Sequence, residues 1–187
     1  MSVSAESIAA AIKSAEGRGL PPVERWNPPF CGDLDMRIAR DGTWHYLGSP
    51  IGRAPLVRLF STVLKREGDR YFLVTPVEKV GITVDDAPFL AVDFDAEGEG
   101  EAQSLTFLTS VGDRVTADAE HPIRVATRDG EPAPYVEVRA GLEALIDRKS
   151  FFRLVDHAVT REIDGEAVFG VWSKNTFFEI AKACDLT

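Results

Sequence analysis

The sequence lacks the features that would place it in a membrane, metal-binding or disulfide-rich class. Its two cysteines, Cys31 and Cys184, belong to no CxxC or Cys/His spacing, so neither a zinc site nor a disulfide framework is expected. No apolar run approaches the roughly 18 residues that a membrane span needs. The opening MSVSAE has no basic flank ahead of a long apolar stretch, which argues against a signal peptide. We therefore expect a cytoplasmic protein with free thiols, no metal and no membrane span.

Familiar catalytic and cofactor motifs are also missing. The sequence contains no GxxxxGK[ST], GxSxG or HExxH motif. Its close glycine pair, Gly98 and Gly100, is followed by Gln103 where a dinucleotide fingerprint has a third small residue. We expect no cofactor and no catalytic residue. A hydrolase that uses His45 or His157 beside a carboxylate stays open as an alternative.

Positive charge is scarce and unevenly distributed. The 187 residues include 21 Lys and Arg against 30 Asp and Glu, a net charge of -9. Residues 1–84 hold 11 basic and 9 acidic residues, whereas residues 85–187 hold 10 and 21. Duplex nucleic acid is not expected as a partner, because binding it needs a basic footprint.

Prolines and a capped helix mark an N-terminal arm at residues 1–20. Ser4 suits a helix N-cap, and the apolar residues that follow it are one helical turn apart, which predicts a short amphipathic helix over 5–15. Proline pairs at 21–22 and 28–29 then interrupt regular structure.

Two further domains are expected, at residues 21–85 and 86–187. The first has a hairpin around Asp41-Gly42, a helix at 55–66, and strands at 71–75 and 77–84. The second has strands at 89–94, 105–109, 114–117, 123–127 and 135–138, a helix at 141–149, and strands at 151–159 and 167–172. Runs of antiparallel hairpins with one helix in each half favour an α+β fold with mostly antiparallel sheets.

The two halves repeat a short pattern, which suggests a duplicated unit. The first copy is Arg40-Asp41-Gly42, then a helix that opens on Arg53-Ala54, then an aromatic strand at 71–74. The second copy is Arg128-Asp129-Gly130, then Arg139-Ala140, then an aromatic segment at 151–155. We expect two related hairpin-helix-strand units.

The hairpin offers a candidate stacking surface. With a two-residue loop, Ile38 pairs with His45, and Arg37, Trp44 and Tyr46 share one face of the hairpin. An arginine beside two aromatic rings suits a planar ligand. The alternative is that Trp44 and Tyr46 pack inside the protein. A loop one residue longer would exchange the two faces.

Two further cations are candidates for holding an anion. Arg53 follows the glycine-rich segment 48–52 and precedes the expected helix, whose N-terminus favours phosphate or carboxylate. Lys79 lies in an otherwise apolar strand next to Glu78. For Arg53 the simpler alternative is a turn followed by a helix-starting arginine that pairs with an acidic residue of the second half, and for Lys79 it is a surface ion pair.

Several sequence blocks resemble a known family. They are CGDLDMRI (31–38), RDGTW (40–44), TPVEKVGI (75–82), DAPF (86–89), HPIRV (121–125) and GVWS (170–173). On these blocks the chain is similar to the bacterial DUF1285 family of uncharacterised proteins. The resemblance implies a duplicated α+β core whose C-terminal half is similar to a pleckstrin-homology-like, partly open barrel. It also implies a ligand site between the halves for something nucleotide-based, and a link to signal transduction.

We therefore expect a non-enzymatic sensor or adaptor that binds a small anionic, nucleotide-like ligand between the repeats. Arg37, Trp44 and Tyr46 would stack on the ligand, and Arg53 and Lys79 would hold its anionic groups. The alternative is a protein-interaction module, in which exposed strands accept a partner peptide and the acidic half selects a basic partner.

Overall fold

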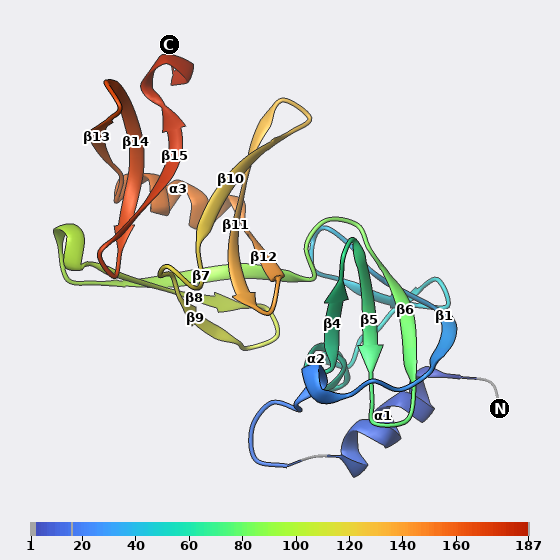
Figure 1. Ribbon diagram of the computed structural model, residues 1–187. Coiled ribbons are helices and arrows are strands. Elements are labelled where there is room, and N and C mark those ends of the chain that lie inside the picture. The colour runs from blue at the N-terminus through green and yellow to red at the C-terminus, as the bar shows by residue number, and fades with distance from the viewer. Residues whose placement is uncertain (1–2, 16, 187) are drawn as a thin grey trace. The chain divides into compact units, whose positions relative to one another are not determined.

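The computed structural model describes residues 3–15 and 17–186, so residues 1, 2 and 16 of the expected arm and residue 187 lie outside the described part. The chain forms two compact units, Met1–Pro88 (unit 1) and Phe89–Thr187 (unit 2). Each unit contains one six-stranded sheet (Figure 1). The predicted α+β class with mostly antiparallel sheets is confirmed.

Unit 1 places two helices and a short turn of 3-10 helix around its sheet. The elements are α1 (Ala5–Ser14), η1 (Val23–Arg25), β1 (Phe30–Ile38), β2 (Trp44–Tyr46), β3 (Ser49–Pro50), α2 (Ala54–Ser61), β4 (Leu64–Glu67), β5 (Arg70–Val74) and β6 (Lys79–Val84). The strand order is β3-β2-β1-β6-β5-β4. β1 and β6 pair in parallel, and the other neighbours are antiparallel.

Unit 2 repeats this sheet and adds a helix and a second sheet of three strands. Its elements are β7 (Phe89–Glu97), η2 (Gly100–Ala102), β8 (Ser104–Thr109), β9 (Arg114–Thr116), β10 (Ile123–Arg128), β11 (Glu131–Arg139), β12 (Leu142–Ile146), α3 (Arg148–Asp156), β13 (Val159–Ile163), β14 (Glu166–Ser173), β15 (Thr176–Lys182) and η3 (Ala183–Leu186). Its six-stranded sheet has the order β10-β11-β12-β7-β8-β9, and one of the two six-stranded sheets of the chain is a curled half-barrel. β13, β14 and β15 form a separate three-stranded sheet.

The two six-stranded sheets have the same topology, which confirms two related units. Read from the other edge, the order in unit 2 is β9-β8-β7-β12-β11-β10, so β1 to β6 correspond to β7 to β12 in sequence. The first strand pairs in parallel with the sixth in both sheets. The motif correspondence predicted from sequence was wrong, however, because the turn at Asp129-Gly130 joins β10 to β11 and therefore matches the β4–β5 turn rather than the loop at Asp41-Gly42.

Helix boundaries in the second half were also wrong. Residues 142–146 form β12, because Ala140 and Gly141 both have positive φ, at 48° and 76°, and make a turn. The helix starts later, where the side chain of Asp147 accepts a hydrogen bond from the Ser150 N–H at 2.8 Å. Residues predicted as a strand from 151 therefore lie in α3.

The first-half helix is shorter than predicted. α2 stops at Ser61 instead of reaching residue 66, and its C-cap residue, Thr62, donates its hydroxyl to the Leu59 carbonyl at 2.6 Å. The following residues pair with β5, with Leu64 opposite Leu73. The helix predicted over 5–15 is confirmed as α1, with Ser4 in a capping box.

The β1–β2 hairpin has a loop one residue longer than predicted. Ala39 N–H donates to the Thr43 carbonyl at 2.9 Å, so the loop is the three residues 40–42. Its register pairs Ile38 with Trp44 and Arg37 with His45. The predicted face assignment was therefore wrong, because paired residues share a face. Trp44 lies on the apolar face of the hairpin and Arg37 on the opposite one.

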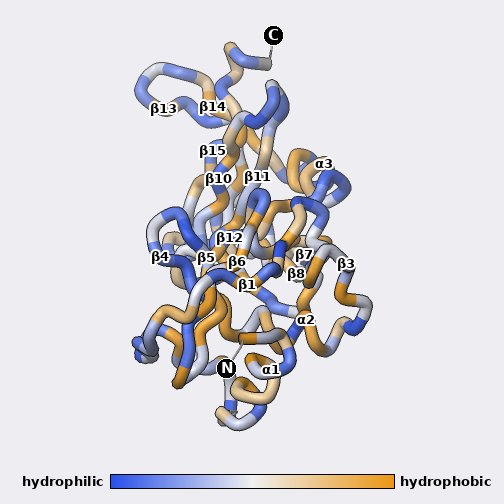
Figure 2. The backbone as a smooth tube through the Cα atoms, turned by 90° about the vertical axis from the view of Figure 1, so that its right-hand side faces the viewer, coloured by the Kyte–Doolittle hydropathy of each residue, from blue (hydrophilic) through white to orange (hydrophobic). Residues whose placement is uncertain are grey.

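The core of unit 1 lies between this apolar face and the two helices. Trp44 is 2% exposed and stacks on Phe60 of α2, with ring centroids 6.3 Å apart. Ile8 and Ile12 of α1 are buried as well. Hydrophobic residues recur along the strands of both units (Figure 2), as alternation of buried and exposed side chains requires.

Two glycines allow a test of close packing in the sheets. A Cβ on Gly170 would lie 2.3 Å from the Phe178 carbonyl oxygen, whereas a Cβ on Gly81 would lie 2.1 Å from the end of the exposed Asp33 side chain. We expect Gly170→Ala to lower the free energy of unfolding by about 1–3 kcal/mol or more, since backbone must move. Gly81→Ala should cost less, about 1 kcal/mol, because only an exposed Asp33–Arg70 ion pair is displaced. Urea unfolding of both variants measures this, and a larger loss for Gly81→Ala would contradict it.

Candidate functional site

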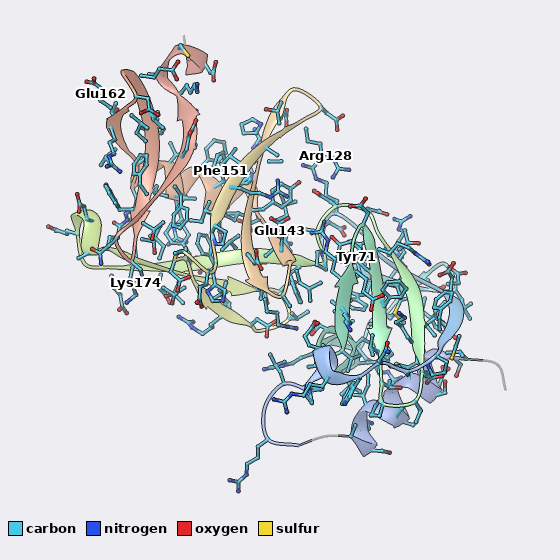
Figure 3. The ribbon with its side chains drawn as sticks, in the orientation of Figure 1. Tyr71, Arg128, Glu143, Phe151, Glu162 and Lys174 are labelled. Carbon is cyan, nitrogen blue, oxygen red and sulfur yellow. The ribbon has the colours of Figure 1, made fainter. Side chains whose placement is uncertain are left out.

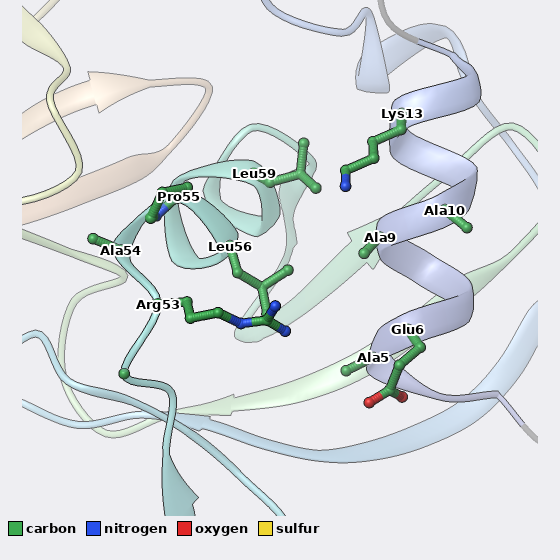
Figure 4. A pocket seen from close by; sticks show the side chains of 11 residues that line it. Ala5, Glu6, Ala9, Ala10, Lys13, Arg53, Ala54, Pro55, Leu56 and Leu59 are labelled. Carbon is green, nitrogen blue, oxygen red and sulfur yellow. The ribbon is translucent and has the colours of Figure 1, made fainter.

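A groove lies between α1 and α2 in unit 1 (Figure 4). Its volume is about 660 Å³. The lining residues are mostly small or aliphatic, with three charged ones: Ala5, Glu6, Ala9, Ala10 and Lys13 of α1, and Gly52, Arg53, Ala54, Pro55, Leu56 and Leu59 at α2. The groove belongs to unit 1 alone.

The α1 wall is held by both packing and a backbone hydrogen bond. Ile8 and Ile12 are buried, and the Ala5 N–H donates to the Tyr46 hydroxyl at 3.3 Å. Residues 5, 9 and 13 are four apart and share one helix face. Because alanines occupy two of these three positions, open space is left beside α2.

The α2 wall begins at Arg53, the N-cap residue of the helix. Its carbonyl accepts hydrogen bonds from the Leu56 and Val57 N–H groups at 3.0 and 3.2 Å. Its side chain makes no capping hydrogen bond, and the first turn has no acidic residue. Figure 4 shows the guanidinium extending beside Leu56 toward α1. Pro55 near the start of the helix fits this position, where a missing N–H costs least.

The charges of the groove are open to a ligand. In the described part of the chain, neither Arg53 nor Lys13 has a hydrogen-bonding or ion-pairing partner for its side chain. Both residues are exposed. With Glu6 they give the groove a net charge of +1. The N-terminal end of α2 adds partial positive charge beside Arg53.

The aromatic residues predicted to stack on a ligand lie behind this groove. Trp44 and Tyr46 share the face of β2 that packs toward the helices, and the Trp44 ring is covered by Phe60. Tyr46 is half-buried and uses its hydroxyl to accept from Ala5. A role for either ring in ligand binding stays a prediction.

Arg37 and Lys79 lie on the opposite face of the same sheet, so the five predicted residues do not converge. Arg37 Nε is 3.4 Å from an Asp85 carboxylate oxygen. Lys79 Nζ is 3.0 Å from Glu67 Oε2 and 4.9 Å from the centroid of the Phe72 ring. Their predicted contact with a ligand is untested, and only Arg53 lines the groove.

The sequence analysis did not identify the α1 residues of the groove. It predicted only a short amphipathic helix over 5–15 and assigned no role to Glu6 or Lys13. The available signal was the four-residue spacing of Ala5, Ala9 and Lys13, which predicts a narrow strip of small residues ending in a cation. That spacing indicates a groove only when the neighbouring helix is known.

The described residues show neither a metal-ligating cluster nor a membrane-spanning helix. Among residues 3–15 and 17–186, no three His, Cys, Asp or Glu side chains are grouped to hold a metal ion. No described helix is long and apolar enough to cross a membrane.

Two six-stranded sheets of identical order define a duplicated two-domain α+β protein. Family models agree with this class: "Domain of unknown function (DUF1285), N-terminal domain" matches residues 21–87, and "Protein of unknown function (DUF1285), C-terminal domain" matches residues 88–180. The chain belongs to the DUF1285 family, as its sequence blocks indicated.

Solved structures of the same family are similar to this chain. A DUF1285 family protein from Silicibacter pomeroyi DSS-3 is 57% identical, with a TM-score of 0.88 over 96% of this chain and 97% of that one. A DUF1285 family protein from Shewanella baltica OS155 is 31% identical, with a TM-score of 0.53 over 66% of this chain and 91% of that one. Comparison with curated proteins finds no match.

The Lys79–Glu67 pair gives a pH-dependent prediction. The hydrogen bond from Lys79 lowers the pKa of Glu67 below its ordinary value, and burial partly opposes this. A lowered carboxyl pKa contributes stability above the unfolded-state pKa, and this contribution is lost as pH falls through the folded-state pKa. The stability difference between wild type and Lys79→Met should therefore shrink as pH falls from 7 to below about 4.

Urea unfolding at several pH values checks this expectation. The matched control is Lys79→Met in a Glu67→Gln background, where the difference should not vary with pH because the titrating carboxyl is gone. If the stability difference between wild type and Lys79→Met stays constant from neutral to acidic pH, the Lys79–Glu67 pair does not contribute pH-dependent stability, which would contradict this prediction.

Proposed function

We propose that this protein is a non-enzymatic cytoplasmic sensor or adaptor, and that unit 1 binds a small anionic ligand with an aliphatic chain in the α1–α2 groove. The observation that carries this proposal is an arginine without a partner, Arg53, at the mouth of an apolar groove. Arginine in such a position offers two parallel donors to a carboxylate or phosphate.

The size and lining of the groove support an aliphatic ligand. A volume of about 660 Å³ falls within the range of small-molecule sites, which combine an apolar wall with a few polar groups. Leu56, Leu59 and the alanines of α1 supply the apolar wall. Burying a chain there gains about 0.8 kcal/mol for each methylene.

The charge of the groove supports a monoanion. Arg53 and Lys13 together exceed Glu6 by one positive charge. A ligand with a single carboxylate matches this balance, whereas a polyphosphate would face the Glu6 carboxylate as well. The partial positive charge at the N-terminal end of α2 favours the same anionic group.

A nucleotide is the other ligand class that the sequence suggested. Within the described residues, the groove lining includes no aromatic side chain on which a base would stack. The groove therefore favours an aliphatic anion over a nucleotide, and nucleotides serve as a comparison in the test.

Binding in this groove would also suit a sensor. The ligand would contact α1 and α2 together and so stabilise the docked arrangement of the N-terminal helix. A partner that distinguishes docked from undocked α1 would then respond to the ligand.

The test is calorimetric titration with saturated carboxylates and alkyl phosphates of increasing length, below their micellar concentrations, and with mono- and cyclic nucleotides. Affinity should rise about threefold to fourfold for each added methylene until the groove is full. Arg53→Ala should weaken binding about tenfold or more, because a charge-assisted contact is lost. Arg58→Ala, an exposed arginine of α2 outside the groove, should bind as the wild type does.

Three results would contradict the proposal. One is no binding of any chain length, another is equal weakening by both arginine variants, and the third is nucleotide binding that Arg53→Ala leaves unchanged. Thermal unfolding of the free variants controls for folding, since both residues are exposed and neither should change the melting temperature by more than a few degrees.

A further inference from the structure

The outward side of α3 in unit 2 carries an exposed aromatic ring beside two cations. Phe152 is 59% exposed, so a large apolar side chain is left in water. Arg148 and Lys149 precede it by one helical turn and therefore lie on the same side of the helix. Both cations are exposed, and the Arg148 guanidinium is 5.5 Å from the centroid of the Phe152 ring. We call these three residues the α3 outer face.

The α3 outer face is not what attaches the helix to unit 2. The opposite side of α3 is buried, with Ser150 and Leu154 at 0% exposure, and it packs against β7 and β14. Arg153 adds a link to β7, because it pairs with Asp93 and donates to the Phe94 carbonyl at 3.0 Å. These contacts hold the helix in place and leave the outer face free to meet another molecule.

The two cations of this face lie at the end of the helix that disfavours them. The N-terminal end of a helix carries partial positive charge, so an acidic side chain stabilises the first turn and a basic one does not. Arg148 and Lys149 are the first two residues of α3, whose first turn has no acidic residue. Each cation placed in this way costs about 0.3–1 kcal/mol of helix stability. Residues that break a local stability rule are expected at functional sites.

Cations are scarce in unit 2, and many of them are already paired. Residues 89–187 hold 10 Lys and Arg against 19 Asp and Glu. Ion pairs engage Arg114, Arg124, Arg139, Arg153 and Lys182. Neither Arg148 nor Lys149 forms an ion pair with any residue of the described part of the chain. Two adjacent cations without an ion-pair partner are therefore available to an external anion.

The nearest carboxylates do not neutralise the α3 outer face. Asp93 is held mainly by the hydrogen bond from Arg153, which lowers its pKa, and Lys149 adds only a smaller electrostatic contribution. The Asp147 carboxylate accepts from the Ser150 N–H, and against it Arg148 and Lys149 still leave one positive charge in excess. Asp156 is about 12 Å further along the helix, beyond the screening length of about 8 Å at physiological salt.

An acidic protein segment fits this face better than a lipid surface does. Each cation near an anionic membrane contributes about 1 kcal/mol, so Arg148 and Lys149 give little attachment to a chain with a net charge of -9. A carboxylate of a protein segment can instead accept two parallel hydrogen bonds from Arg148. An apolar side chain next to that carboxylate can pack on the Phe152 ring. Arginine and aromatic side chains are also the ones that dominate binding energy in protein interfaces.

We propose that the α3 outer face is a docking site for an acidic segment of a partner protein. An Asp or Glu of the segment binds Arg148 and Lys149, and a neighbouring apolar side chain of the segment covers Phe152. This site is independent of the groove in unit 1.

A library of random peptides, selected on the full-length protein, tests the proposal. Enriched peptides should carry more Asp and Glu than Lys and Arg, together with an apolar residue. The affinity of their synthetic versions should fall as salt rises. Arg148→Glu should weaken binding about tenfold or more, because a charge-assisted contact becomes a repulsive one. Phe152→Ala should weaken it by a similar factor, because the apolar contact is lost.

Lys174 offers a matched control for the charge reversal. It is exposed and forms no ion pair with the described residues, and it lies at the β14–β15 turn, away from α3 (Figure 3). Lys174→Glu should therefore bind the peptides as the wild type does.

Thermal unfolding separates lost binding from lost folding. Arg148→Glu places an acidic residue at the start of α3, where it is favourable, so its melting temperature should equal or exceed that of the wild type. Lys149→Glu replaces Arg148→Glu if the latter lowers the melting temperature.

The outcomes support or overturn the docking site. Acidic peptides that lose affinity on Arg148→Glu and on Phe152→Ala, but not on Lys174→Glu, support it. No enrichment over the bare support overturns it, as do enriched peptides that are predominantly basic or that bind Arg148→Glu as tightly as the wild type. Binding to phosphatidylserine vesicles that Arg148→Glu abolishes, without any enriched peptide, means that the face meets a lipid surface and overturns the proposal as well.

Discussion

The stacking of Trp44 on Phe60 is the interaction on which unit 1 depends. A ring buried to this extent contributes several kcal/mol, because its loss leaves a large cavity, and the aromatic contact adds about 0.5–1.5 kcal/mol. The contact fixes α2 against the sheet and therefore fixes Arg53 at the helix start. On the same face of β2, Tyr46 holds the first turn of α1. The groove between the helices follows from these two neighbouring contacts.

A one-residue difference in a loop decides this arrangement. With residues 40–42 as the loop, Trp44 lies opposite Ile38 and turns inward. With a two-residue loop it would lie opposite Ala39 and turn outward. The Asp41-Gly42 pair predicts a hairpin but not its loop length, since glycine at positive φ suits both two-residue and three-residue loops. Arg37 and Trp44 could therefore be predicted to lie in one hairpin, but not on which faces.

Duplication could be predicted from the sequence, although its details could not. The short motifs that first suggested it, such as Arg128-Asp129-Gly130, fall at non-equivalent turns. The true correspondence is in strand order, β1 to β6 with β7 to β12, and in the parallel pairing of the first and sixth strands. Turn dipeptides such as Asp-Gly recur wherever hairpins occur. They therefore indicate hairpins, but they do not show which hairpin of one repeat is equivalent to which hairpin of the other. The helix was misplaced for a related reason: Leu142 and Ile146 fit a helical turn as well as an alternating strand.

Of the candidate site, Arg53 was predictable because a glycine-rich turn before a helix is an anion-binding pattern. The α1 wall could not be predicted, because the alanines of α1 form the wall of a groove only when α2 is known to lie beside them. Unit 2 shows the same limit: Arg148, Lys149 and Phe152 are visible in the sequence, but the helix face that they share is recognisable only from the structure. Membership of the DUF1285 family indicates the fold of the chain. It does not indicate a ligand, which has to be inferred from the chemistry of the groove.

The central claim, an aliphatic anion bound between α1 and α2, is tested most directly by following backbone amide NMR signals during titration with dodecanoate. The account predicts saturable shifts concentrated at residues 5–13 and 52–59, with β13 to β15 unaffected. Shifts spread evenly over both units, or absent from α1 and α2 at saturating ligand, would contradict it.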